Sequence, residues 1–198
     1  MDTASDKLLD LARSHALVRP KDLAPLGIPR VALTRAVRSG QLLHLGRGLY
    51  GLSRPASAHG TFAEVAYRVP KGVICLLSAL RFHNLTTQAP FEVWLAIANK
   101  AAVPKLDYPP LRLVRFSGAA LNQGIEEHIV DGVTIRVTSV AKTVADCFKF
   151  RNKIGLDVAL EALREAWREK RMTSEEIWRH AKICRVANVM RPYLESLA

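Results

Sequence analysis

Five side chains between residues 30 and 47 have the chemistry needed to bind DNA: Arg30, Thr34, Arg35, Arg38 and Arg47. An arginine guanidinium pairs with a phosphate or with the edge of a guanine, and a threonine hydroxyl can contact either group. From Leu23 to Ala63 the chain has no Asp or Glu, so no acid in this segment neutralises the arginines. An acid-free basic segment attracts phosphates, although it can also be a solvated cationic face that keeps the protein soluble.

The sequence predicts that three short helices position these side chains. The first is capped by Thr3 or Ser5, the second begins with a proline and covers residues 20–26, and the third covers residues 29–40. Glycine takes the left-handed conformation that ends helices, so Gly40 closes the third helix, and a glycine-containing turn separates the second from the third. Three short helices with such a turn are typical of a helix-turn-helix.

The third helix has an inner and an outer face. At 100° per residue, one side carries the residues expected in the core: Leu33, Ala36 and Val37. The opposite side carries the outward set: Val31, Thr34, Arg35 and Arg38. Arg30 lies near the core flank at the start of the helix, so we expect it to contact the DNA backbone rather than a base.

A β-hairpin is expected directly after the third helix. Two short apolar strands, at residues 41–45 and 49–52, flank the sequence Gly46-Arg47-Gly48, and glycines supply the positive φ that hairpin turns require. In this position the hairpin is a wing, and Arg47 at its tip is placed to enter a minor groove or to hold a phosphate. Residues 1–55 are therefore predicted to be a winged helix-turn-helix that binds DNA, the alternative being a protein-docking module of the same fold.

Residues 56–198 are predicted to be a second, larger domain after a linker at Ser53–Gly60. Helix, strand and helix patterns follow one another, which predicts a mixed α/β domain and an α+β protein overall. The expected helices cover residues 61–69, 73–82, 140–148 and 156–167, with a further one behind a capping box at 173–176. The expected strands cover 91–97 and 111–116, with a hairpin at 129–137 that turns at Asp131-Gly132.

The sequence contains no pattern of residues that predicts catalysis. A glycine-rich phosphate loop, a zinc-protease helix and a nucleophile elbow are absent, and no acid-x-lysine pair falls on a predicted strand. Lys142 and Asp146 are four residues apart on a helix, where we expect a surface ion pair. The prediction is a protein that is not an enzyme, with no catalytic residue, cofactor or metal.

The overall composition limits the kinds of partner and the cellular locations that are expected for the protein. The net charge is +11, from 29 Lys and Arg against 18 Asp and Glu, which suits a polyanionic partner. The three cysteines are too widely spaced for a disulfide framework or a zinc site, and the start of the chain lacks the pattern of a signal peptide. No apolar run reaches the roughly 18–20 residues that a membrane span needs. The sequence thus predicts a cytoplasmic protein that does not act at a membrane.

Several segments resemble a known family. Gly27-Ile28-Pro29-Arg30, Arg35-Ala36-Val37 and Gly46-Arg47-Gly48-Leu49-Tyr50 are similar to the N-terminal winged helix of AbiEi-type antitoxins, from type IV abortive-infection toxin–antitoxin systems. Further along, Ser78-Ala79-Leu80 and the segment 137–146 are similar to landmarks of that family's second domain. A related N-terminal part also precedes nuclease-like domains of the very-short-patch-repair type, but the amphipathic helix at 156–167 replaces the acidic metal ligands expected there.

The resemblance implies an autorepressing antitoxin that contributes to phage defence. Its winged helix would bind inverted repeats in double-stranded operator DNA, and its second domain would counteract a co-encoded nucleotidyltransferase-like toxin, with or without a stable complex. The DNA-binding roles carry over to Thr34, Arg35, Arg38 and Arg47, and Lys142 and Arg81 are candidate antitoxic residues. Two other functions remain open: a winged-helix transcription factor whose second domain binds a ligand or dimerises, and a nuclease-like enzyme with degenerate metal ligands.

Overall fold

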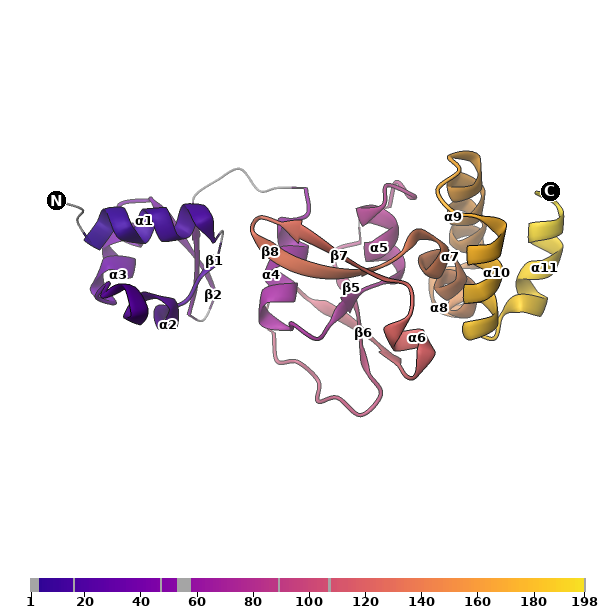
Figure 1. Ribbon diagram of the computed structural model, residues 1–198, viewed down its shortest axis with the longest axis horizontal. Coiled ribbons are helices and arrows are strands. Elements are labelled where there is room, and N and C mark those ends of the chain that lie inside the picture. Colours follow the sequence, from indigo (N-terminus) through magenta and orange to yellow (C-terminus); the bar gives the residue numbers. More distant parts are fainter. Residues whose placement is uncertain are drawn as a thin grey trace. The chain divides into compact units, whose positions relative to one another are not determined.

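The computed structural model describes residues 4–15, 17–46, 48–52, 58–88, 90–106 and 108–197. The chain divides into two compact units (Figure 1). The first comprises Met1–Arg68 together with Ile129–Thr134, and the second comprises Val69–His128 together with Ile135–Ala198. The division by contacts falls after Arg68, whereas the sequence prediction ends the first domain at residue 55. The architecture is α+β, as predicted.

The first unit begins with helices and continues into a hairpin. Its elements, in chain order, are α1 (Ala4–Ser14), β1 (Leu17–Val18), α2 (Pro20–Leu23), the 3-10 helix η1 (Ala24–Leu26), α3 (Val31–Arg38), β2 (Leu42–Gly46), β3 (Leu49–Leu52) and α4 (Gly60–Arg68). Gly27 follows η1 with φ of 66°, the left-handed conformation that turns the chain toward α3. The helices and hairpin predicted for residues 1–55 are therefore present in the predicted order.

An apolar core holds α1, α2 and α3 together. Its buried members are Leu8, Ala12, Val18, Leu23, Ile28, Ala32, Leu33, Ala36 and Leu42. Full burial of a leucine side chain contributes about 1.5–3 kcal/mol, so this cluster is the main source of stability for the helical part. On α3, Ala32 is buried and Val37 only half-buried, so the core face is centred closer to Ala32 than the sequence analysis expected.

The hairpin belongs to a three-stranded antiparallel sheet with the order β1-β3-β2. Leu17 pairs with Gly51 and Val18 with Tyr50, so β1 joins the hairpin to the segment between α1 and α2. Strand β1 was not predicted from the sequence, because a strand of two residues has no periodicity. The extra strand fixes the hairpin against the helices, which a free hairpin of two strands would not achieve.

Helix α4 makes specific contacts with the rest of the first unit. The guanidinium of Arg19 donates to the carbonyl of Tyr67 at 2.8 Å and stacks 4.0 Å from the centre of its ring. The Tyr67 hydroxyl donates to Asp22 at 3.2 Å. From the same helix end, Arg68 donates to the carbonyl of Leu45 in β2 at 2.9 Å. These bonds explain why α4 groups with the N-terminal helices.

A five-stranded sheet with the order β6-β5-β4-β8-β7 is the centre of the larger part of the fold. Its strands are β4 (Val73–Ile74), β5 (Val93–Ala98), β6 (Leu111–Phe116), β7 (Ile125–Val130) and β8 (Val133–Thr138). The sheet is mixed, since β4 runs parallel to β8 and antiparallel to β5, while β5 and β6 are parallel. At the predicted Asp131-Gly132 turn, φ is 50° and 75°, as a tight hairpin turn of this type requires.

The single helix predicted over residues 73–82 is wrong in its first part. Val73 and Ile74 form the central strand β4, Cys75 is extended, and α5 (Leu76–Phe82) begins only afterwards. A short run that is apolar at every position fits a strand buried on both faces as well as a buried helix, and periodicity does not separate the two. The segment forms a strand because it pairs with β5 and β8, which lie far along the chain.

Helices follow the sheet in the last third of the chain. They are α7 (Val140–Lys149), α8 (Arg151–Ile154), α9 (Leu156–Arg168), α10 (Ser174–Ile183) and α11 (Ala187–Glu195), and the short α6 (Ala119–Asn122) precedes β7. Two predicted helix starts are confirmed: Ser139 caps α7, and Thr173 with Glu176 forms the capping box of α10. Figure 1 shows α7 among α8, α9 and α10, and it contacts α5, α9 and α10.

Candidate nucleic-acid interface

The outward face of α3 is exposed as the sequence analysis predicted. Thr34, Arg35 and Arg38 are exposed along the helix, and Val31 at its start keeps 49% of its surface accessible. Arg30 is also exposed and occupies the N-cap position, next to the first turn. Four of the five predicted DNA-binding side chains therefore lie on one accessible helix face or at its N-terminal end. We call Arg30, Arg35 and Arg38 the α3 arginines.

The α3 arginines are not neutralised by the acids of their own unit. Across the described residues none of the three forms an ion pair, whereas several acids have other partners. Asp10 pairs with Arg13 at 3.0 Å, and Glu64 pairs with Arg68 at 2.7 Å. The carboxylate of Asp22 accepts from a backbone N–H at 2.8 Å. The positive charge on α3 is therefore available to an external anion.

The wing is described on both sides of its tip. Arg47, the fifth predicted contact, lies outside the described residues. Next to it, Gly48 has φ of 68°, and the strands β2 and β3 pair with an irregularity between His44 and Gly46. The exposed His44 packs against Tyr50, with 5.0 Å between ring centres and 34° between the ring planes. The hairpin that was predicted to carry Arg47 is thus formed.

Gly46 is required for a reason that the sequence did not reveal. A Cβ atom at this position would lie 2.1 Å from Nη2 of Arg68, and φ at Gly46 is 151°. The glycine therefore makes room for the same guanidinium that donates to the carbonyl of Leu45. Arg68 falls in the segment predicted to belong to the second domain, so the sequence contains no indication that it supports the wing.

In the second unit, the prediction that Lys142 and Asp146 form a surface ion pair is wrong. Both side chains are fully buried, with 2.7 Å between Nζ and Oδ2. Burial raises the pKa of Asp146 against the opposing attraction of Lys142. Spacing of i,i+4 predicts only that two side chains meet. The apolar neighbours on α7 that surround both residues were the available signal of burial.

The three cysteines are free thiols, and all are buried. Cys184 donates from Sγ to Oδ1 of Asp146 at 3.1 Å, which extends the buried ion pair. Burial is the largest cause that raises the pKa of each thiol, to about 12 for Cys184. A thiol with a raised pKa is a poor nucleophile and a poor metal ligand, so these cysteines contribute to packing rather than to chemistry.

The described residues contain neither a candidate metal site nor a helix that could span a membrane. In the parts of the chain that the structure describes, no group of three or more His, Cys, Asp or Glu side chains is arranged to hold a metal ion. None of the described helices has the length and apolar character that crossing a membrane would require.

The N-terminal part of the chain is similar to a known family. No curated protein gives a significant match to the chain. Residues 6–53 match the family described as "Transcriptional regulator, AbiEi antitoxin". The matched segment extends from α1 to the end of the wing and contains all five predicted DNA-binding residues. Residues 6–53 are therefore similar to a domain of transcriptional regulators that are AbiEi antitoxins.

Proposed function

We propose that this protein is the antitoxin of a type IV toxin–antitoxin system and represses its own operon. Residues 1–55 would bind inverted repeats in the operator, and residues 56–198 would counteract a co-encoded nucleotidyltransferase-like toxin without catalysing a reaction. The DNA-binding part of the proposal rests on one observation. The α3 arginines are exposed, form no ion pair among the described residues, and lie within the segment that matches the family. The proposed location of the protein is the cytoplasm.

Each exposed residue of α3 is assigned a role by its position. The N-terminal half of a recognition helix usually lies deepest in the major groove, so Thr34 and Arg35 would read base edges there. Val31 supplies an exposed apolar surface of the kind that contacts a thymine methyl group. Arg30, at the helix start, and Arg38, at its end, would hold phosphates on either side of the groove, and Arg47 would reach the neighbouring minor groove.

Arg35→Ala should lower the ratio of operator affinity to random-DNA affinity by about tenfold or more. A bidentate contact between arginine and guanine contributes about 1–3 kcal/mol of discrimination, and about 1.4 kcal/mol corresponds to a factor of ten. Arg38→Ala should weaken binding to both DNAs by similar factors, because a phosphate contact carries no sequence information. Fluorescence anisotropy with both DNAs in one buffer measures the two ratios.

A matched control for this experiment is Arg13→Ala. Arg13 is an exposed arginine of the same unit that already pairs with Asp10, so its loss should change neither ratio. If Arg38→Ala reduces specificity more than Arg35→Ala, the helix docks with its C-terminal half deepest. If no variant reduces operator binding, α3 is not the recognition helix and the proposal of DNA binding through this face fails.

The antitoxic half of the proposal concerns the second unit. Lys142 is fully buried and therefore cannot contact a toxin, which removes one of the two residues considered from the sequence. Arg81 is exposed on α5 and stays a candidate.

The proposal expects a neighbouring gene that encodes a nucleotidyltransferase-like toxin, and co-expression with that gene tests whether the chain is an antitoxin. From an external promoter, which bypasses autorepression, the chain should restore growth that the neighbour's product stops. Arg35→Ala should restore growth equally well, because its effect is confined to DNA recognition. Growth inhibition that persists in the presence of well-expressed, folded wild-type chain would contradict the antitoxin assignment, while a rescue that is lost with Arg35→Ala would place the antitoxic surface on the first unit.

A further inference from the structure

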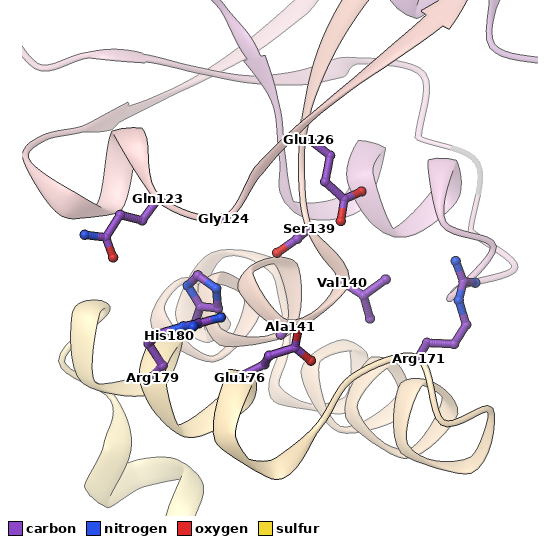
Figure 2. A pocket seen from close by; sticks show the side chains of 10 residues that line it. All are labelled: Gln123, Gly124, Glu126, Ser139, Val140, Ala141, Arg171, Glu176, Arg179 and His180. Atoms are coloured by element: carbon purple, nitrogen blue, oxygen red, sulfur yellow. The ribbon is translucent and has the colours of Figure 1, made fainter.

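A cavity of about 400 Å³ lies in the second unit, where the N-terminal end of α7 faces α10. Figure 2 shows its walls: the turn at Gly124 that precedes β7, the first residues of α7, and side chains from α10. Sites for small molecules commonly occupy roughly 300–1,000 Å³, so the cavity is large enough for a ligand of that class.

The start of α7 offers hydrogen-bond donors to this cavity. Ser139, Val140 and Ala141 all line it. The first N–H groups of a helix have no carbonyl partner within the helix and point out of its N-terminal end. Here the N–H of Ser139 already donates to the carbonyl of Gly124 at 2.8 Å. The next amides, at Val140 and Ala141, give the helix end the partial positive charge that favours an anion.

His180 is a second, independent sign of a ligand. Its side chain lines the cavity and is only 3% exposed, yet among the described residues Nδ1 has no hydrogen-bond partner. A buried polar atom without a partner costs about 1–3 kcal/mol, so such an atom calls for an explanation. Burial, together with the nearby charges of Lys142 and Arg179, lowers the pKa of His180 to about 4. The imidazole is therefore neutral at pH 7 and offers one N–H donor and one acceptor nitrogen.

The close approach of His180 to the turn depends on Gly124. A Cβ atom at residue 124 would lie 2.5 Å from Cε1 of His180, and φ at this glycine is 67°. The side chain and the turn are thus fitted to each other. This fit holds the imidazole beside the start of α7, where Figure 2 shows it between Gly124 and Ala141.

Arg179 adds a full positive charge at the same place. It is exposed, it lines the cavity, and among the described side chains it forms no ion pair. Arg171, at the other end of the cavity, donates to the carbonyl of His83 and is therefore partly engaged. Figure 2 shows Arg179 next to His180 and Arg171 well apart from them.

The two carboxylates that line the cavity have partners of their own. Glu176 accepts from the backbone N–H and from the hydroxyl of Thr173, at 2.8 and 2.9 Å, because it belongs to the capping box of α10. These bonds lower the pKa of Glu176, so it stays ionised and committed to the helix cap. Glu126 lies 3.1 Å from Nε2 of His128. Neither carboxylate needs the cavity to satisfy its charge.

We infer that this cavity binds the phosphate group of a small phosphorylated molecule. The amides of Val140 and Ala141, the imidazole of His180 and the guanidinium of Arg179 supply donors to one anion. A phosphate has more acceptor oxygens than a carboxylate and can use donors that converge from several directions. Since the cavity exceeds the size of a phosphate ion, the remaining volume accommodates the organic part. The inference concerns the second unit alone and does not depend on DNA binding.

The test uses the full chain and three probes at constant ionic strength: inorganic phosphate, adenosine monophosphate and acetate. Phosphate and the nucleotide should each bind saturably in isothermal titration and raise Tm, whereas acetate should bind at least tenfold more weakly. Arg179→Gln should weaken phosphate binding by about tenfold or more, since a hydrogen bond to a charged group contributes about 1.5–3 kcal/mol. The matched control is Arg164→Gln, which removes an exposed arginine of α9 outside the cavity.

A second variant tests the helix amides without removing a charge. Val140 is the first residue of α7, a position where proline is well tolerated, and Ser139 has the extended ψ of 162° that a following proline requires. Val140→Pro should preserve the helix by circular dichroism while weakening phosphate binding, again by about tenfold.

The comparison between probes also identifies the source of the phosphate group. Tighter binding of the nucleotide indicates a phosphorylated organic molecule, and equal or tighter binding of the inorganic ion indicates free phosphate in the same site. The inference is wrong if neither probe binds, if acetate binds as well as phosphate, or if Arg179→Gln binds both like the wild type. The last result would assign any phosphate binding to another basic surface, such as the α3 arginines.

Discussion

Lys142→Ala should lower the free energy of unfolding of the second unit by about 3–5 kcal/mol, the usual cost of leaving a buried charge without its partner. The substitution removes the ammonium group 2.7 Å from Asp146, whose carboxylate has no exposed surface. It also removes a cation that lies 4.7 Å from the centre of the Phe116 ring. Lys182→Ala, which replaces an exposed lysine on α10, is the matched control and should change stability by less than about 0.5 kcal/mol.

Denaturant unfolding followed by tryptophan fluorescence measures this change selectively. The three tryptophans, Trp94, Trp167 and Trp178, all lie in the second unit, so the signal does not report on the N-terminal unit. The double variant Lys142→Met with Asp146→Leu separates charge from packing. It should recover most of the loss, because a buried ion pair can often be replaced by apolar side chains of similar size. A double variant as unstable as Lys142→Ala would show that the pair is needed for more than mutual neutralisation.

Acidification should destabilise the second unit through His180. The ordinary histidine pKa is 6.5 and the folded-state pKa of His180 is about 4, so the unfolded chain binds the proton more readily. Stability from this residue is therefore complete above pH 6.5 and is lost as the pH falls toward 4. Since one pKa unit corresponds to about 1.4 kcal/mol, the loss between pH 7 and pH 4.5 is about 2–3 kcal/mol.

The measurement is the difference between wild type and His180→Phe, each unfolded at pH 7 and at pH 4.5. Other groups also titrate in this window: burial lowers the pKa of His83, which acts in the same direction, and raises that of Asp146, which acts in the opposite one. Both contributions are present in each protein and cancel in the comparison. A wild type that loses no more stability than His180→Phe on acidification would mean that His180 is protonated as easily in the folded state as in the unfolded one.

Local sequence patterns predicted correctly those features that depend on interactions between neighbouring residues. The caps at Ser139 and Thr173 and the turn at Asp131-Gly132 are all confirmed, because each depends on side chains within four residues of one another. The exposed face of α3 follows from helical periodicity alone. Its binding role, in contrast, depends on DNA that is outside the chain, so the assignments of Arg30, Thr34, Arg35 and Arg38 stay predictions, and so does that of Arg47.

Long-range contacts account for the features that the sequence did not reveal. Strand β4 exists because β5 and β8 pair with it, and Lys142 is buried because α5, α9 and α10 pack against α7. His180 was not singled out, since a histidine on an amphipathic helix has many ordinary roles. It contacts Gly124, which lies more than fifty residues away in the sequence, and no local sequence pattern predicts a contact over that separation.

Under the proposed function, the contacts of α4 with the wing determine how much of the chain must be exchanged to transfer DNA specificity from one protein to another. Arg68 occupies the space that Gly46 leaves open, and Tyr67 holds Arg19 and Asp22. A graft that stopped before α4 would carry the glycine without the guanidinium that it accommodates, and the wing would lose a support next to its tip. Under the proposed function, recombination between relatives that exchanges operator preference therefore has its best junction after Arg68, so that the proposed DNA-binding elements stay together with the helix that supports the wing.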